Sequence, residues 1–446
     1  MKAYPSYKEY KPSNVDWLGE IPEHWDVKKL KFLGTALIGL TYSPDDVVDE
    51  NYLGKKYLVL RSSNIQNNKI ELSDTVFVTK EIPQELKVQK DDILICARNG
   101  SRLLVGKSAR INSALPNTTF GAFMTVFRSK INPFLSFYFN STQFQSQTTI
   151  FLTTTINQLT NHDLNEVWVS VPPLSEQQMI ADFLDRETAK IDSLIQKRND
   201  LIRLLQEKRS AVISHAVTKG IDPTVRLKPS NIDWLGEIPE HWEVKKLKYT
   251  ASIKTGFAFN SEDYDDEGVP LVRISDIAQD GTISLNNTKY LPQTFAKKYS
   301  EFYVNKNDIL MAMTGATIGK AGRYTQDNTA LLNQRVCKFM PKKLNNDFLW
   351  FLLKSNQYCE YIKITSLGGA QANISDNLLL DFLATIPPFS EQQEIADFLD
   401  RENAKIDSLI EKEKKIIEKM KEYRTALISA AVTGKIDVRG EVSHGA

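Results

Sequence analysis

Apolar residues recur at heptad spacing in two long stretches of the chain that contain neither glycine nor proline. Each stretch follows a Pro-Pro pair, and the two end at Gly220 and Gly434. Ser175 and Ser390, each followed three residues later by a glutamine, predict N-caps with capping boxes. The pattern therefore predicts two helices of about 40 residues each, roughly 60 Å at 1.5 Å per residue.

One seven-residue series in each predicted helix is apolar except for a single charge near the helix midpoint, Arg198 or Glu413. Such series predict an intramolecular antiparallel coiled coil, in which these opposite charges would set the register. The alternative is two independent helices, each packed on its own domain. The predicted seam comprises Leu184, Ile191, Arg198, Leu205, Leu399, Ile406, Glu413 and Met420. The predicted companion positions are Ile180, Leu194, Leu201, Ile395, Leu409 and Ile416.

The chain contains a duplicated frame. Residues 11–31 return as residues 228–248 with two differences, and residues 172–195 return as residues 387–410 with three differences. The shifts, 217 and 215 residues, have the size of a whole domain, which excludes short-period solenoids and propellers. The segments between these blocks, about 32–171 and 249–386, are dissimilar in sequence. The chain therefore alternates a shared frame with a variable insert, twice.

Both variable segments carry short apolar strands followed by polar, glycine-bearing loops. The residues around Leu58–Leu60 match those around Pro270–Val272, and Asp92–Cys96 matches Asp308–Ala312. Loops that leave a rigid strand are common places for recognition residues. The fold class predicted is α+β, with two pseudo-symmetric mixed α/β domains joined by the two long helices.

Composition is that of an ordinary globular protein, with 41% hydrophobic and 25% charged residues. The 56 basic and 55 acidic side chains leave a net charge of +1, which argues against a uniformly basic surface and allows local basic faces. The chain has no apolar run of the ~18 residues that a membrane span needs. Three cysteines without a CxxC pair predict reduced thiols. We therefore expect a cytoplasmic protein that contacts no membrane.

Catalytic signatures are missing from the sequence. The Gly100–Ser108 segment resembles a phosphate-binding loop, but five residues instead of four separate its glycines. His24 and His241, each beside a tryptophan in the frame, are interpreted as packed or capping residues in preference to catalysts. The acidic clusters Asp45–Asp46 and Asp263–Glu267 are interpreted as hydrated loops in preference to metal sites. No catalytic residue and no metal ligand is predicted.

The whole pattern resembles the specificity subunit of type I restriction–modification systems. The resemblance is carried by Gly-Glu-Ile-Pro-Glu-His-Trp at the start of each half, by Pro-Pro-x-Ser-Glu-Gln-Gln before each long helix, and by residues 216–222 and 431–437 after it. The resemblance implies target-recognition domains at 1–171 and 221–386, helical spacers at 172–220 and 387–437, and a tail at 438–446.

The same resemblance implies a non-catalytic role in a larger complex. Each recognition domain would read one half of a bipartite double-stranded DNA target. Two modification subunits, which bind S-adenosylmethionine and methylate adenine, would dock on the frame. Restriction subunits, where present, would use ATP and magnesium. Because the inserts differ, the target should be asymmetric, and helices of roughly 60 Å would separate its halves by a distance comparable with ~18 base pairs.

Candidate DNA contacts lie on the glycine-bearing loops and strand ends of the two inserts. Arginine with guanine and Asn or Gln with adenine would specify bases, whereas lysine would mostly contact phosphates. Arg61 and Arg273, each at the end of an apolar strand, could instead be structural, and Gln371 and Asn373 are weaker candidates. The predicted contacts are Arg61, Arg98, Asn99, Arg102, Lys107, Arg273, Thr314, Lys320, Arg323 and Gln334.

Two other functions remain open on the sequence alone. One is a single-chain nuclease or methyltransferase with an unfamiliar site, which would be active as the purified chain. The other is a coiled-coil assembly scaffold without DNA specificity, which would show no salt-sensitive, sequence-selective DNA binding even with modification subunits present.

Overall fold

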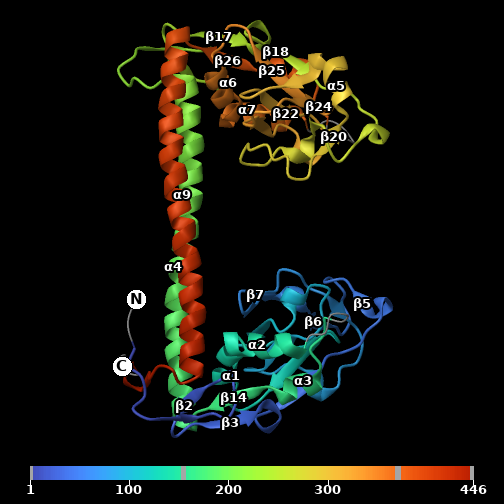
Figure 1. Cartoon of the computed structure of the whole chain (residues 1–446), viewed down its shortest axis with the longest axis vertical. Coiled ribbons are helices and arrows are strands. Elements are labelled where there is room, and N and C mark those ends of the chain that lie inside the picture. The colour runs from blue at the N-terminus through green and yellow to red at the C-terminus, as the bar shows by residue number, and fades with distance from the viewer. Residues whose placement is uncertain (1–3, 152–156, 367–372, 442–446) are drawn as a thin grey trace. The chain divides into compact units, whose positions relative to one another are not determined.

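The structure is a computed structural model, and it describes residues 4–151, 157–366 and 373–441. The chain divides into two compact units (Figure 1). The first unit comprises Met1–Arg198 with Lys414–Ala446, and the second comprises Asn199–Glu413. Each unit thus contains one variable segment and part of each long helix.

Each unit opens with the duplicated frame as a small antiparallel scaffold. In the first unit β1 (Tyr10–Pro12) pairs with β2 (Glu20–Pro22), and β3 (Asp26–Lys29) pairs with β14 (Trp168–Val171). The β3–β14 pair joins the start of the variable segment to its end. The equivalent strands of the second unit are β15 (Leu227–Pro229) with β16 (Glu237–Pro239), and β17 (Glu243–Lys246) with β26 (Leu383–Ile386).

The variable segment of the first unit forms two four-stranded sheets, ordered β11-β10-β13-β4 and β12-β6-β9-β5. The first sheet is antiparallel, and the second contains the parallel pair β6–β12. The strands are β4 (Thr35–Ile38), β5 (Val47–Val48), β6 (Tyr57–Leu60), β7 (Ile65–Gln66), β8 (Lys69–Ile70), β9 (Phe77–Val78), β10 (Ile93–Cys96), β11 (Ser108–Arg110), β12 (Thr118–Phe120) and β13 (Met124–Arg128). The helices are α1 (Asn132–Tyr138), α2 (Thr142–Phe151) and α3 (Asn161–Glu166).

The second unit repeats this plan although its variable segment is dissimilar in sequence. Its antiparallel sheet is ordered β18-β25-β22-β23, and its other sheet, β20-β19-β24-β21, contains the parallel pair β19–β24. The strands are β18 (Ala251–Thr255), β19 (Val269–Val272), β20 (Lys289–Leu291), β21 (Tyr303–Val304), β22 (Ile309–Ala312), β23 (Ala321–Arg323), β24 (Ala330–Leu332) and β25 (Val336–Pro341). The helices are α5 (Gln293–Lys298), α6 (Asn346–Lys354), α7 (Asn356–Thr365) and α8 (Asp376–Leu380).

The two long helices are α4 (Leu174–Lys219), of 46 residues, and α9 (Phe389–Val432), of 44 residues. The predicted capping boxes are wrong, because α4 begins at Leu174 and Ser175 already lies in its first turn. The amides of Glu176 and Gln177 donate to the Pro173 carbonyl oxygen at 2.9 Å each, so the backbone of the preceding proline starts the helix.

The long helices pack against each other in opposite directions within each unit. In the first unit the start of α4 and the end of α9 run side by side (Figure 1), and Arg424 Nε donates to Asp192 Oδ1 at 2.8 Å. In the second unit Arg209 of α4 forms an ion pair with Asp407 of α9. The predicted α+β fold with a paired, antiparallel set of long helices is confirmed.

The predicted seam series lies inward on both helices. Glu413, although charged, is among its buried members, and Arg198 is half-buried. Because these two residues belong to different units, their pairing stays a prediction. The buried members are Leu184, Ile191, Leu399, Ile406 and Glu413, and the half-buried ones are Arg198, Leu205 and Met420.

The predicted companion series is wrong along the middle of the helices. Leu409 is 45% exposed, whereas its neighbour Ile410 is 6% exposed. Leu194 and Leu201 are exposed in the same way. Around Ile406 and Glu413 the inward companion lies four residues later, so the heptad there reads Ile406, Ile410, Glu413 and Ile417. Near the helix starts the predicted companions Ile180 and Ile395 are buried as predicted, and Ile416 is half-buried. Among the described residues, no helix is both long and apolar enough to cross a membrane.

Candidate nucleic-acid interface

Three loops of the first unit surround a cavity of about 750 Å³. They follow β4, follow β6 and precede β13, at residues 40–44, 61–63 and 121–124. Much of the lining is apolar or aromatic, and its charged side chains are those of Arg61 and Asp74. The lining residues from these loops and their surroundings include Leu40, Tyr42, Pro44, Val47, Arg61, Asp74, Phe123 and Met124.

A fourth loop, which follows β10, is tied to the same place. The backbone amides of Ala97 and Arg98 both donate to the carbonyl oxygen of Phe123, at 3.0 Å each. Asn99 Nδ2 donates to Ser62 Oγ at 3.3 Å. The Arg98 guanidinium lies 5.3 Å from the centre of the Phe123 ring, within the range of a cation–π contact. Phe123 nevertheless keeps 61% of its surface exposed.

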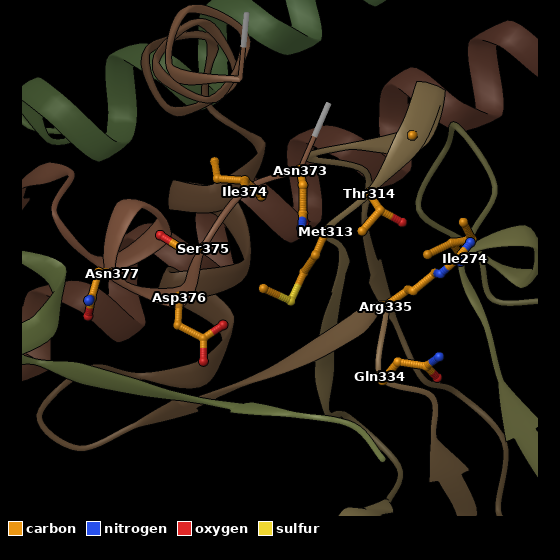
Figure 2. Close-up of a pocket in the computed structure, with 11 residues that line it drawn as sticks. Ile274, Met313, Thr314, Gln334, Arg335, Asn373, Ile374, Ser375, Asp376 and Asn377 are labelled. Atoms are coloured by element: carbon orange, nitrogen blue, oxygen red, sulfur yellow. The ribbon is translucent and has the colours of Figure 1, made fainter. Parts of the chain in front are cut away.

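The second unit has a cavity of about 950 Å³ at the equivalent place, drawn in Figure 2. Equivalent segments build it, because Ile274 follows β19, Thr314 follows β22, and Gln334 and Arg335 precede β25. Figure 2 shows Thr314, Gln334 and Arg335 on one side and Ser375 and Asp376 on the other. The full lining is Ile274, Met313, Thr314, Gly315, Gln334, Arg335, Asn373, Ile374, Ser375, Asp376 and Asn377.

The backbone ties of the second cavity repeat those of the first. The amide of Met313 donates to the Arg335 carbonyl oxygen at 2.9 Å, as Ala97 does to Phe123. The amide of Ile374 donates to the Met313 carbonyl oxygen at 3.0 Å, which brings the start of α8 to the cavity. Arg335 therefore occupies in the second unit the position that Phe123 occupies in the first.

Polar side chains in the second cavity are oriented for contact. Thr255 Oγ1 donates to the Asp376 carboxylate at 2.9 and 3.0 Å, which holds that acceptor in one orientation. Thr314 Oγ1 is buried and has no hydrogen-bond partner among the described residues. A hydroxyl in this state costs free energy until a ligand or water satisfies it. The cavity thus offers an acceptor, from Asp376, and a charged donor, from Arg335, while the Thr314 hydroxyl lies buried in its wall.

Close backbone approach shapes both cavities at equivalent glycines. A Cβ atom at Gly39, at the end of β4, would collide with the carbonyl oxygen of Gly121. A Cβ atom at Gly256, at the end of β18, would collide with the carbonyl oxygen of Asn333. These glycines let one strand end lie directly against the loop that carries Phe123 or Arg335.

The frame histidines serve the helix starts instead of a catalytic site. His24 Nε2 lies 2.8 Å from Glu176 Oε2, and Trp25 Nε1 donates to Glu176 Oε1 at 3.2 Å. His241 and Trp242 hold Glu391 in the same way, at 2.8 and 3.0 Å. Each glutamate therefore links the first turn of a long helix to the frame of its unit.

Burial favours the neutral form of the cysteine thiols beside these cavities. Burial raises the pKa of the Cys96 thiol, although the Asn99 hydrogen bond and the Lys107 charge act in the opposite sense. Burial likewise raises the pKa of the Cys337 thiol well above its usual range. Neutral thiols are poor nucleophiles. Within the described parts of the chain, no group of three or more His, Cys, Asp or Glu residues is placed to hold a metal ion.

Comparison with known proteins identifies the family. Residues 22–203 and 239–421 each match the family described as "Type I restriction modification DNA specificity domain". The chain belongs to this family. The type I restriction enzyme MjaVIII specificity subunit of Methanocaldococcus jannaschii is 27% identical over 97% of both chains. The EcoKI specificity subunit of Escherichia coli is 24% identical over 94% of this chain and 90% of that relative.

A solved structure supports the same fold. It is described as "Structural basis underlying complex assembly and conformational transition of the type I R-M system". One of its chains matches with a TM-score of 0.68 and 16% identity, over 92% of this chain and 98% of that one. The chain is thus a type I specificity subunit with two recognition domains. Catalysis in such systems belongs to partner subunits, as predicted.

The structure brings five of the predicted DNA contacts of this specificity subunit to the two cavities. Arg61 lines the first cavity, where its Nη2 also donates to Asp74 Oδ1 at 2.7 Å. The others are Arg98 and Asn99, on the loop tied to the first cavity, and Thr314 and Gln334, which line the second. Asn373, a weaker candidate, lines the second cavity, and Gln371 lies outside the described residues.

The other predicted contacts lie away from the cavity linings. Arg102 donates to the Thr149 carbonyl oxygen at 3.3 Å, and Arg273 to that of Asn287 at 3.1 Å. Lys107 is half-buried directly before β11. Lys320 lines a separate cavity of about 360 Å³.

Arg323 has a mainly structural environment. Its Nη1 lies 3.0 Å from Asp347 Oδ1, and its guanidinium lies over the Trp350 ring at 5.0 Å. Both partners are on α6, so Arg323 joins β23 to that helix. Its contact with DNA stays a prediction without geometric support.

Sequence reasoning missed Phe123, Arg335 and Asp376. The segments before β13 and β25 carry no shared motif, so nothing in them marked Phe123 as the counterpart of Arg335. Gln334, directly beside Arg335, is among the predicted contacts, so the segment before β25 is identified from the sequence although Arg335 itself is not. Asp376 gave no signal, because only folding brings α8 to the cavity.

Proposed function

We propose that each recognition domain of this specificity subunit reads one half of an asymmetric, bipartite double-stranded DNA target. The observation that carries the proposal is the pair of equivalent cavities, built by the same loops and lined by different side chains. A shared framework with different recognition groups suits two different half-sites. The chain itself then supplies recognition and no catalysis.

The chemistry of the second cavity matches base edges in the major groove. Arginine donates two hydrogen bonds to guanine, glutamine pairs with adenine, and a carboxylate accepts from cytosine. Arg335, Gln334 and Asp376 provide one of each. Both Gln334 and Arg335 are exposed, so DNA would reach them without unfolding the domain.

The long helices would set the spacing between the half-sites. Helices of 46 and 44 residues measure about 69 and 66 Å at ~1.5 Å per residue. That length corresponds to about 20 base pairs at ~3.4 Å each. A stiff spacer of this kind tolerates little change in the number of bases between the halves.

The frame and helices would dock two modification subunits, which would carry S-adenosylmethionine and methylate adenine. Restriction subunits, where present, would bring ATP and magnesium. Three leucines on the second unit's part of the helices support docking there, because they remain exposed beside the seam. These are Leu201, Leu204 and Leu409. Partner helices would cover such apolar side chains.

Methylation mapping tests the proposal. The chain is expressed with its modification subunits, and methylated adenine is mapped across the genome. We expect one bipartite, asymmetric motif. Exchanging residues 32–171 for another insert should change one half of that motif, whereas a change in both halves would contradict the assignment of one domain to one half-site.

A measurement of DNA binding distinguishes the proposed function from the two alternatives, an assembly scaffold and a single-chain enzyme. The complex with modification subunits should bind the mapped sequence selectively and lose affinity as salt rises. Absence of selective binding would favour an assembly scaffold, and methylation by the purified chain alone would favour an unrecognised enzyme.

A further inference from the structure

The two cavities carry residues of different chemistry at one equivalent position. Phe123 lies directly before β13, and Arg335 lies directly before β25. The carbonyl oxygen of each residue accepts a backbone hydrogen bond from the loop that follows the neighbouring strand, β10 in the first unit and β22 in the second. Phe123 is 61% exposed although phenylalanine usually lies inside proteins. More than half of the Phe123 surface therefore makes no contact within the described part of the first domain.

The backbone of Phe123 is held in a defined position. Besides the two amides that donate to its carbonyl oxygen, a turn closes beside it, where the amide of Met124 donates to Gly121 at 2.8 Å. The Arg98 guanidinium covers the ring at 5.3 Å. A contact made by this ring would therefore cost little additional conformational entropy.

The surroundings of the ring are suited to an apolar ligand group. Tyr42, Pro44 and Val47 line the same cavity, and Val47 is itself partly exposed. In the major groove, thymine is distinguished by its C5-methyl group, which apolar side chains contact. A polar base edge pressed against this surface would lose its water without gaining a hydrogen bond.

We infer that Phe123 contacts the C5-methyl group of a thymine in the first half-site, and that this contact helps to specify that base pair. The inference rests on the proposed function. The Arg98 guanidinium, 5.3 Å from the ring centre, would donate its N–H groups to an adjacent base or phosphate. In the second domain, Arg335 replaces this apolar contact by a charged donor.

Uracil substitution tests the inference, because uracil differs from thymine only by the missing methyl group. Each thymine of the mapped first half-site is replaced singly by uracil. Binding of the full chain with its modification subunits is measured by fluorescence anisotropy at constant salt. At one position we expect affinity to fall about fourfold, the effect of losing one buried methyl-sized group.

The coupling to Phe123 decides the result. The Phe123→Ala variant should bind the thymine duplex more weakly than wild type does. It should also bind the duplexes with thymine and with uracil at that position with equal affinity. Leu103→Ala is the matched control, because Leu103 is 93% exposed on the loop after β10, whereas that loop contacts Phe123 through Ala97 and Arg98. This control should keep the wild-type preference for thymine.

Several results would overturn the inference. They are a first half-site without thymine, no uracil position that weakens binding, and a uracil effect that persists in Phe123→Ala. An equal loss on both duplexes would indicate a wedge between bases instead of a methyl contact, and would also overturn it. If the wild-type complex shows no selective binding at all, the proposed function fails, whereas selective binding without coupling removes only the role of Phe123.

Discussion

Replacing Arg335 by alanine is expected to relax recognition at one base pair of the second half-site and to leave the fold intact. Arg335 is exposed, and among the described residues no carboxylate lies within 4.0 Å of its guanidinium. Its removal therefore leaves no buried partner unpaired, and we expect the free energy of unfolding to change by less than about 0.5 kcal/mol.

The expected effect on DNA binding is much larger. A bidentate arginine–guanine pair contributes about 1–3 kcal/mol of discrimination, or roughly 5- to 150-fold in affinity. Arg335→Lys keeps the charge but loses the planar fork, so it should retain attraction to DNA and lose most of the discrimination. Comparison of the two variants separates base reading from general electrostatic attraction.

The assay uses the chain in complex with its modification subunits and a panel of duplexes in which each base pair of the second half-site is changed. Wild type should reject substitutions at every specified position, and Arg335→Ala should accept them at one. An equal loss of affinity for all sequences would contradict base reading by Arg335. In that case the slope of log affinity against log salt concentration should also fall by the contribution of about one phosphate contact. That result would place Arg335 on the DNA backbone.

Three further predictions concern the frame, the helix seam and pH. Glu176→Ala should destabilise the first unit by about 3 kcal/mol, because it leaves two buried donors, the Tyr7 hydroxyl and the Trp25 indole N–H, unpaired, while Glu391→Ala, which leaves only the Trp242 indole N–H of this kind, should cost less; equal losses in thermal unfolding would contradict this. Ile410→Ala should cost about 2–4 kcal/mol and Leu409→Ala below about 1 kcal/mol, measured by denaturant unfolding; similar costs would contradict the observed seam. Two lysines lower the pKa of Glu166 from 4.5 to about 2, so its stabilising contribution, present above pH 4.5, should disappear as pH falls toward 2. The melting temperature of Glu166→Gln should therefore approach that of wild type at low pH, and a constant difference would contradict the ion pairs.

The equivalence of the two cavities explains how one scaffold serves two different recognition tasks. Backbone hydrogen bonds, such as those from Ala97 to Phe123 and from Met313 to Arg335, position the loops. These bonds do not depend on side-chain identity. The side chains at the loop tips are therefore able to change without disturbing the sheets, and Phe123 and Arg335 show the extent of such change.

Several features of the protein follow from the sequence alone. The duplicated frame, the two long helices and the apolar strands around Leu58–Leu60 and Asp92–Cys96 are all visible as repeats or periodic patterns. These features arise from local periodicity or from near-identity between the halves, and neither depends on the rest of the chain. The family resemblance rests on the same features.

Other features are decided only by the tertiary structure. Leu409 and Ile410 are adjacent and both apolar, so helical periodicity accommodates either as the companion of the seam, and only packing against the second helix places Ile410 inward. The recognition cavities depend in the same way on long-range contacts. Asp376 lines the same cavity as Thr314 and Arg335 because backbone hydrogen bonds connect segments that are distant in sequence. Local sequence patterns do not predict such bonds.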